Sequence, residues 1–171
     1  ANALAASAVG YNNTAGGVGS STIGYNNTAT NENASAFGYG NTAGGLASSA
    51  FGFSNTASGD NANAFGYNNI ASGSKSNVFG SSSTAVGTAN EVAAENSTAI
   101  GNNNTISSGA ENSAALGNNI SISLKDSVAL GNNSTATAIN SVTGNSSYTK
   151  WAGVSDVVGV VSVGSSGATR Q

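Results

Sequence analysis

Small apolar residues and glycine recur along this chain at a fixed interval. Each interval contains a short Ser-Ala-apolar-Gly element, as in Ser7–Gly10 and Ser35–Gly38. The glycine that closes the element marks the repeat, and the first six marker glycines are 14 residues apart. Beyond Gly80 the spacings are 21, 16, 14 and 13 residues, the last of them to Gly144. The markers are Gly10, Gly24, Gly38, Gly52, Gly66, Gly80, Gly101, Gly117 and Gly131.

A second apolar position follows each marker glycine by five residues. It is usually Ala, with Thr before it and often Asn before that, as in Asn13–Ala15 and Asn41–Ala43. Each interval therefore predicts a short strand, a turn at Gly and Asn, a second short strand and a Gly/Ser/Asn-rich corner. No apolar stripe has the three-to-four spacing of a helix. We expect the seven extra residues of the 21-residue spacing to lie within Val86–Asn96, in a connection between strands.

Two short strands in a 14-residue coil cannot bury an apolar face by themselves. Stacked coils align equivalent residues, and each coil can exchange backbone hydrogen bonds with the next. The sequence therefore predicts an all-β fold, a parallel β-solenoid of about ten coils. With strands about 4.8 Å apart, the stack would be about 45–50 Å long.

The core of such a solenoid is expected to be thin. We expect an inner layer of Ala with one Val, Ile, Phe or Leu per coil, which is little apolar area against the entropy of ordering fourteen residues. Several strands also have two adjacent apolar residues, as in Val78-Phe79 and Ala129-Leu130. One face of each strand would then pack into the interior of the solenoid, and the other face would pack against a neighbouring chain. We therefore expect a homo-oligomer.

Composition narrows the possible functions. Charged residues make up 6% of the 171-residue chain, the net charge is −3, and there is no His, Cys, Pro or Met. Zinc fingers, iron–sulfur sites and Ser-His-Asp triads are therefore excluded. The basic residues stand singly, so no nucleic-acid partner is expected. Most charges fall eight to ten residues after a marker glycine, which predicts an exposed corner there.

Three later elements indicate a family. They are Asn96–Gly101, Asn112–Gly117 and Asp126–Gly131, which read NSTAIG, NSAALG and DSVALG. They resemble the repeat of the YadA-like head of bacterial trimeric autotransporter adhesins, and the resemblance covers residues 1–145. It implies a left-handed parallel β-roll in which three chains pack as a homotrimer.

The period stops after Gly144, and residues 146–171 differ in composition. This segment is similar to the neck of the same family, which narrows the head onto a coiled-coil stalk. The residues expected to form the neck and its trimer contacts are Tyr148, Lys150, Trp151, Gly164 and Arg170. The alternative is a capping hairpin with a core Trp, because the end of a solenoid exposes unpaired strand edges.

The resemblance implies a non-enzymatic attachment module without cofactors or metals, at the surface of a Gram-negative bacterium. Its partners would be host extracellular matrix (collagen, fibronectin or laminin), host cells, abiotic surfaces or sister bacteria in a biofilm, which gives it a role in virulence. Anchoring in the outer membrane would belong to other segments of the parent protein, and this chain would not itself enter the membrane.

One column of residues is the candidate ligand-binding surface. It follows the marker glycine in the first five coils and consists of Tyr11, Tyr25, Tyr39, Phe53 and Tyr67. Tyr is enriched at interfaces, so the column could contact a ligand. Packing between coils or subunits is the other interpretation. In later coils the column gives way to Ser81, Asn102, Asn118 and Asn132.

Two other functional classes, ice-binding proteins and enzymes, fit the sequence less well. Regularly spaced Thr on a flat β-solenoid is a feature of several ice-binding proteins, but here a single Thr recurs in each coil. Hexapeptide-repeat acyltransferases also use β-coils, but they need a catalytic His that this chain lacks. The carboxylates show no pairing of the kind that glycoside hydrolysis requires.

Overall fold

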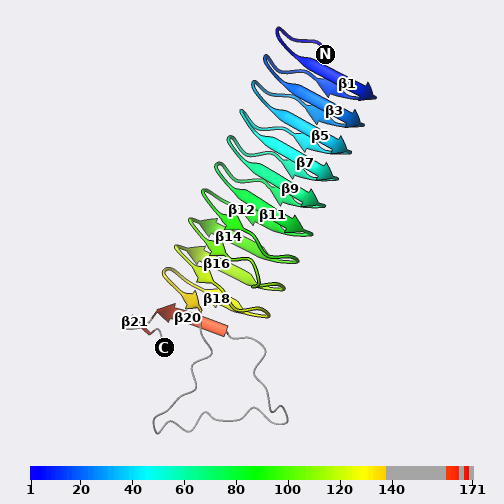
Figure 1. Ribbon diagram of the computed structural model, residues 1–171. Helices are drawn as coiled ribbons and strands as arrows, with labels where there is room; N and C mark the ends of the chain where they lie inside the picture. Colours follow the sequence, from blue (N-terminus) through cyan, green and yellow to red (C-terminus); the bar gives the residue numbers. More distant parts are fainter. Residues whose placement is uncertain (138–160, 166–167, 170–171) are drawn as a thin grey trace, which may run out of the picture.

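The computed structural model describes residues 1–137, 161–165 and 168–169. Within these residues the protein is a parallel β-solenoid of about nine coils with no helix, as the sequence predicts. Each coil contributes one strand to each of two sheets that lie back to back. Figure 1 shows the coils stacked in chain order from the N-terminus, so that neighbours in the stack are also neighbours in sequence.

The two sheets differ in the strands they contain. The first sheet has ten strands: β1 (Ser7–Tyr11), β3 (Ser21–Tyr25), β5 (Ser35–Tyr39), β7 (Ser49–Phe53), β9 (Asn63–Tyr67), β11 (Asn77–Ser81), β13 (Glu91–Val92), β15 (Thr105–Ile106), β17 (Ser121–Ile122) and β19 (Thr135–Ala136). The second sheet has eleven: β2 (Thr14–Ala15), β4 (Thr28–Ala29), β6 (Thr42–Ala43), β8 (Thr56–Ala57), β10 (Ile70–Ala71), β12 (Thr84–Val86), β14 (Thr98–Asn102), β16 (Ala114–Asn118), β18 (Val128–Leu130), β20 (Val161–Ser165) and β21 (Ala168–Thr169).

The marker glycines are stacked in step in the first sheet. Gly10 pairs with Gly24, and the same register continues through Gly38, Gly52 and Gly66 to Gly80. In the second sheet Gly101 pairs with Gly117. The 14-residue spacing is therefore the spacing of one coil.

The backbone repeats at half that length. A residue with positive φ occurs at every seventh position from Ala5 to Asn103, and after a nine-residue step the series continues at Asn112, Asn119, Asp126 and Asn133. Asn and Gly suit these positions because they tolerate the left-handed region. Each coil is thus two half-coils of seven residues, each made of one strand and one turn. We number positions one to seven within each half-coil, starting at Ser7, Thr14, Ser21 and their equivalents.

The interior is lined by the second residue of each half-coil. In most half-coils this residue is Ala, and it is fully buried, as in Ala36, Ala50 and Ala64. Larger residues take the position in Val78, Val92, Ile106 and Ile122. The bulky residue before each marker glycine faces outward, and Ile23 and Leu116 are 48% and 44% exposed. The expectation that one such residue per coil joins the inner layer is therefore wrong, because neighbouring strand residues point to opposite faces.

The seven extra residues between Gly80 and Gly101 are not a loop. They complete an additional half-coil that contains β12, and the chain then continues through β13, whose Glu91 pairs with Asn77 of β11. The expectation of a tolerant connection at Val86–Asn96 is wrong. The spacing from Gly101 to Gly117 is two residues longer than 14, and these two residues do lie in a connection, the turn after β15.

The extra half-coil moves the long strands from one sheet to the other. The five-residue strands β1 to β11 all belong to the first sheet, whereas β14 and β16 belong to the second. In Figure 1 the long arrows lie on one side of the stack down to β11 and on the other side from β14. Residues 7–83 and 84–137 are therefore two regions of one solenoid with their long strands on opposite faces.

Part of the expected neck extends the second sheet. Strand β20 pairs in parallel with β18, and Gly164 of β20 pairs with Thr169 of the antiparallel strand β21. Tyr148, Lys150, Trp151 and Arg170 lie outside the described residues, as does the tenth repeat element at 141–144. The division at residue 145 and the neck remain predictions.

Candidate functional site: exposed apolar columns

Two columns of exposed apolar side chains run along the solenoid. The aromatic ladder occupies the fifth position of the first-sheet half-coils and consists of Tyr11, Tyr25, Tyr39, Phe53 and Tyr67. The apolar stripe occupies the third position of the half-coils with a marker glycine. In the first sheet it comprises Val9, Ile23, Phe37, Phe51, Phe65 and Phe79, and in the second sheet Val86, Ile100, Leu116 and Leu130.

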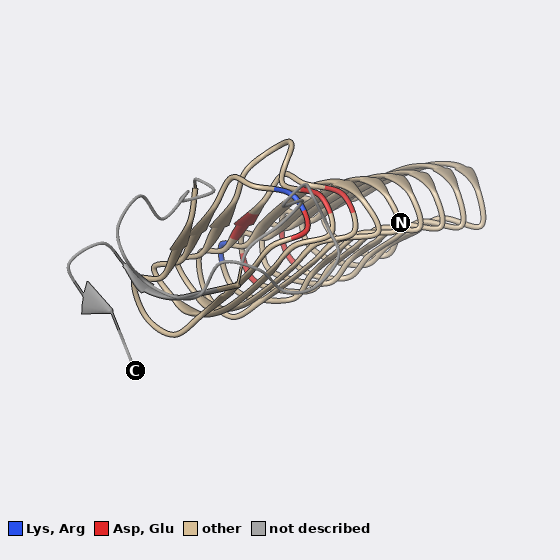
Figure 2. Ribbon diagram, turned by 90° about the horizontal axis from the view of Figure 1, so that it is seen from below, with Lys and Arg blue, Asp and Glu red and all other residues tan. Residues whose placement is uncertain are grey.

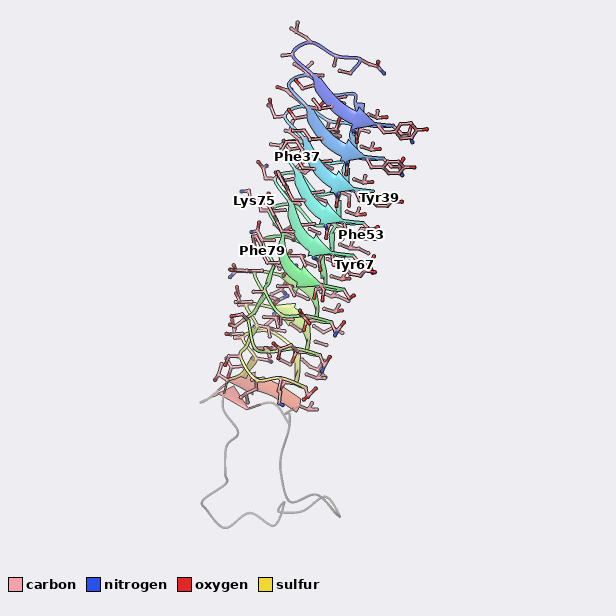
Figure 3. All side chains as sticks on the ribbon, turned by 45° about the vertical axis from the view of Figure 1, so that its right-hand side comes forward. Phe37, Tyr39, Phe53, Tyr67, Lys75 and Phe79 are labelled. Carbon is pink, nitrogen blue, oxygen red and sulfur yellow. The ribbon has the colours of Figure 1, made fainter. Side chains whose placement is uncertain are left out.

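The sequence-predicted ladder residues are brought together as a continuous stack. Their ring centroids are 4.9 to 5.3 Å apart, with interplanar angles of 4° to 15°. The rings remain 43% to 67% exposed. Figure 3 shows Tyr39, Phe53 and Tyr67 in one column at the ends of their strands. The ladder is therefore a flat aromatic surface that is open to contact, as well as a packing device between coils.

A buried amide ladder holds the corner that carries the aromatic rings. The Nδ2 of Asn41 donates to the carbonyl oxygen of Phe37 at 3.0 Å and to that of Gly52, in the next coil, at 2.8 Å. Its Oδ1 accepts from the backbone N–H of Asn55 at 3.0 Å. The same pattern recurs at Asn27, so each Asn fixes the turn of its own coil to the next. Such fully bonded buried amides make the position of the rings precise.

The marker glycines let consecutive coils approach closely at this corner. Gly38 has φ of 120°, and a Cβ there would overlap the carbonyl oxygen of Gly52. The sequence motif thus reflects both a positive φ and a close backbone approach. Gly87, at φ of 105°, makes the same approach to Gly101 and is a marker that sequence reasoning missed. Thr84–Asn90 supplies the signal, since TAVGTAN matches the pattern of TAIGNNN at Thr98–Asn104.

Beyond Tyr67 the edge of the ladder becomes polar. Backbone hydrogen bonds continue the column through Ser81, Glu95, Glu111 and Lys125. The expectation that Asn102, Asn118 and Asn132 continue the column is wrong, because these residues lie on the opposite edge of the solenoid. There the side-chain amide of Asn102 donates to that of Asn118, and the side-chain amide of Asn118 donates to that of Asn132. The extra half-coil causes this exchange of edges.

The apolar stripe includes both exposed and half-buried side chains, and the half-buried ones are Phe37, Phe51, Phe65 and Leu130. Val9, Phe79, Val86 and Ile100 are 41% to 58% exposed. Phe51 stacks on Phe65 at 4.9 Å and 3°, whereas Phe37 meets Phe51 edge-on at 4.7 Å and 80°. In Figure 3 Phe37 and Phe79 lie on the side of the strands away from the aromatic ladder.

Charged residues are few and lie mostly at the turns. Glu32, Asp60 and Lys75 occupy one edge of the solenoid, and Glu95 and Asp126 are on the other. Figure 2 shows long runs of the stack without a charged residue. No group of three or more His, Cys, Asp or Glu that could hold a metal occurs in the described part of the chain. The described residues likewise include no helix that is long and apolar enough to cross a membrane.

The recurring threonines do not form one continuous face. Thr14, Thr28, Thr42 and Thr56 begin strands of the second sheet, but Ile70 interrupts the series. The equivalents in later coils, Thr105 and Thr135, begin strands of the first sheet. Nothing in this arrangement supports the ice-binding alternative.

Comparison with known families agrees with the repeat pattern. The YadA head domain repeat matches residues 15–41, 43–69, 57–76, 80–104 and 125–142. No curated protein matches the sequence significantly. The matched residues cover more than half of the chain and, up to residue 137, lie in the stacked coils. The chain therefore belongs to the YadA head family and is a head region of a trimeric autotransporter adhesin.

Proposed function

We propose that this chain is a non-enzymatic attachment module whose aromatic ladder contacts the ligand. The observation that carries the proposal is the stack of five exposed rings at one edge, which offers a flat aromatic surface about 20 Å long at a rung spacing of about 4.8 Å. Aromatic side chains supply contact area at low entropic cost and are enriched at interfaces. The ligand would be a matrix protein such as collagen, fibronectin or laminin, a host-cell surface, or an abiotic or bacterial surface.

Attachment would be multivalent. Membership of the family implies a homotrimer, which would present three copies of the ladder on one particle. Weak contacts at each copy then combine into avidity when geometry permits them to engage together. The module would act at the bacterial surface, attached to the outer membrane through other segments of its parent protein, and would contribute to biofilm formation or virulence.

Paired substitutions on the two edges test the proposal. The test variant is Tyr25→Ser with Tyr39→Ser, which interrupts the ladder. The matched control is Val18→Ser with Leu46→Ser, which removes two side chains of 48% and 43% exposure at the same half-coil position on the opposite edge. Binding to plates coated with collagen, fibronectin or laminin is compared with the sedimentation of each variant.

We expect the ladder variant to lose at least tenfold in binding while it sediments like the unsubstituted protein. The control should bind normally. Unchanged binding by the ladder variant would refute the ladder as the contact surface. Loss of the assembled species in that variant would instead assign the ladder to packing between chains.

A further inference from the structure

The rings of the aromatic ladder present their edges to solvent. Consecutive rings stack at 4.9 to 5.3 Å with interplanar angles of 4° to 15°, so both faces of each inner ring are covered by its neighbours. The three inner rings are nevertheless 43% to 48% exposed, and this exposed area belongs to the ring edges. Four of the five rungs end in a hydroxyl group, those of Tyr11, Tyr25, Tyr39 and Tyr67.

These hydroxyl groups and the neighbouring amides are available to a ligand. No hydrogen bond within the described part of the chain uses a tyrosine hydroxyl of the ladder. The sixth positions, directly after the rings, include the exposed Asn12, Asn26 and Asn68. The Nδ2 of Asn12 donates to the Oδ1 of Asn26 at 2.8 Å, which leaves the Nδ2 of Asn26 free to donate to a ligand. The edge thus offers a row of hydroxyl and amide groups beside aromatic carbon.

No charge accompanies this row. In residues 1–81 the charged side chains are Glu32, Asp60 and Lys75, and all three lie on the opposite edge. A sulfated or acidic polymer gains affinity from cationic side chains, and a basic partner gains it from carboxylates. Phenol hydroxyl and amide groups instead match the hydroxyl groups of an uncharged sugar, since each can both donate and accept. The chemistry of the edge therefore favours a neutral glycan.

The spacing of the rungs favours the same class of ligand. In an extended glycan of the cellulose or chitin type, equatorial bonds join opposite ends of each pyranose ring, so the chain advances by nearly one rung per sugar. A β-strand peptide laid along the ladder repeats every two residues, about 6.7 Å, and a polyproline II helix every three, about 9.3 Å. Neither is a whole number of rungs, so peptide side chains would drift out of register with the rings. The glycan stays in register along the whole ladder.

We propose that the aromatic ladder binds a neutral, extended polysaccharide of the cellulose or chitin type, with the glycan chain parallel to the solenoid axis and one sugar at each rung. The sugar hydroxyl groups exchange hydrogen bonds with the tyrosine hydroxyls and with the amides of Asn26 and Asn68. The site ends where Ser81 replaces the ring, so it holds one sugar for each of its five rings. This inference rests on the proposed function and names the class of ligand among the surfaces that it allows.

Soluble oligosaccharides of graded length provide the test. Cello-oligosaccharides and chito-oligosaccharides, from the disaccharide to the octasaccharide, are titrated into the assembled protein and followed by calorimetry. Affinity should rise with chain length up to the pentasaccharide and then level, because the ladder has five rungs. The two series distinguish a sugar that carries hydroxyl groups alone from one that also carries acetamido groups. A heparin oligosaccharide of matched length, which is sulfated, should bind at least tenfold more weakly.

Substitutions assign the binding to the ladder. Tyr25→Ser with Tyr39→Ser should reduce the affinity for the hexasaccharide at least tenfold, while the matched control, Val18→Ser with Leu46→Ser, binds normally. Tyr39→Phe removes one hydroxyl but keeps the stack, because Phe53 already occupies the next rung. This variant should lose about threefold to tenfold in affinity, which corresponds to one hydrogen bond.

Equal affinity for the disaccharide and the octasaccharide, or unchanged affinity in the doubly substituted ladder variant, would overturn the proposal. Tighter binding of the heparin oligosaccharide would overturn it too, since no cation accompanies the ladder in residues 1–81. If no oligosaccharide binds but the ladder variant loses adhesion to matrix protein, this inference fails and the proposed function stands. If the ladder variant matches its control in both assays, both fail.

Discussion

Residues 7–83 and residues 84–137 build the same solenoid with opposite assignments of its faces. In the first region the long strands, the apolar stripe and the buried Asn ladder all belong to the first sheet and the edge that follows it. In the second region all three have moved together, so that Ile100 lies on the second sheet and Asn90 and Asn104 line the other edge. The element that moves is therefore a whole half-coil with its strand, glycine and amide. The difference teaches that the folding unit is seven residues long, and that fourteen is the length of two alternating units.

The largest effect is expected from deletions at the boundary between the two regions. Removal of residues 84–90 deletes one complete half-coil and should leave a folded solenoid with all long strands in one sheet. Removal of residues 84–87 leaves an incomplete unit, so strands after the deletion can no longer align their inward and outward residues. We expect the four-residue deletion to abolish cooperative unfolding of the later coils, followed by circular dichroism and limited proteolysis. Equal damage from both deletions would contradict the seven-residue unit.

The next largest effect is expected at the marker glycines of both regions. Gly38→Ala and Gly87→Ala should each destabilise the protein by about 4 kcal/mol or more, because the added Cβ overlaps a carbonyl oxygen of the next coil at a positive φ. Gly44→Ala is the control, since its nearest neighbours would be 3.8 to 4.0 Å away. The measurement is the midpoint of thermal unfolding. A Gly87→Ala variant as stable as Gly44→Ala would show that the second region does not repeat the packing of the first.

A moderate effect is expected in the Asn ladder. Asn41→Asp keeps the shape but turns the atom that donates to Phe37 and Gly52 into an acceptor, which should cost about 3 kcal/mol at neutral pH. Asn41→Ser should cost about 1 kcal/mol, because Ser83 occupies an equivalent position and donates to the Ala94 carbonyl oxygen at 2.6 Å. Chemical denaturation measures both. Equal losses in the two variants would contradict the expectation that a donor at this position, which Ser keeps and Asp lacks, stabilises the turn.

The smallest effect is a stabilisation. The hydroxyl of Ser20 is buried and makes no hydrogen bond, whereas Ala34 and Ala62 occupy equivalent positions in later coils. Ser20→Ala should stabilise the protein by about 1 kcal/mol. Ser48→Ala is the matched control and should destabilise it, because the Ser48 hydroxyl donates to the Gly45 carbonyl oxygen at 2.7 Å. Opposite signs in denaturation experiments are the expected result, and equal signs would contradict it.

The stacking of the coils could be predicted from the sequence, but the change of face could not be read from the marker motif alone. Gly10 to Gly80 recur without error, so the coil length and the alignment of the rings follow directly. Between Gly80 and Gly101 the marker motif recurs at Gly87, which is seven residues after Gly80 instead of fourteen. A search for intervals of fourteen residues from Gly80 therefore misses it. The left-handed residues at every seventh position, often Asn or Gly, carry the signal that reveals it.

The inward face was also ambiguous in the sequence. Ala64 and Phe65 are adjacent and both apolar, so alternation does not tell which of them points into the interior. The geometry decides it, since two facing strands in a seven-residue half-coil leave a lumen that Ala fills and that a ring on every rung would overfill. In every half-coil with a marker glycine, the large apolar residue therefore lies on the outer face. The intrinsic preference of Val, Ile, Leu or Phe for burial does not predict this placement.

The most direct test of the change of face is a disulfide between neighbouring coils at the boundary. Asn77 pairs with Glu91 in the first sheet, and Thr84 pairs with Thr98 in the second. Neighbouring strands bring such residues within the Cα separation of about 4.4–6.8 Å that a disulfide needs. Asn77→Cys with Glu91→Cys should therefore oxidise to an intramolecular disulfide, whereas Asn77→Cys with Thr98→Cys should not. A disulfide in the second pair and none in the first would mean that residues 84–90 loop out and that the stripe never leaves its face.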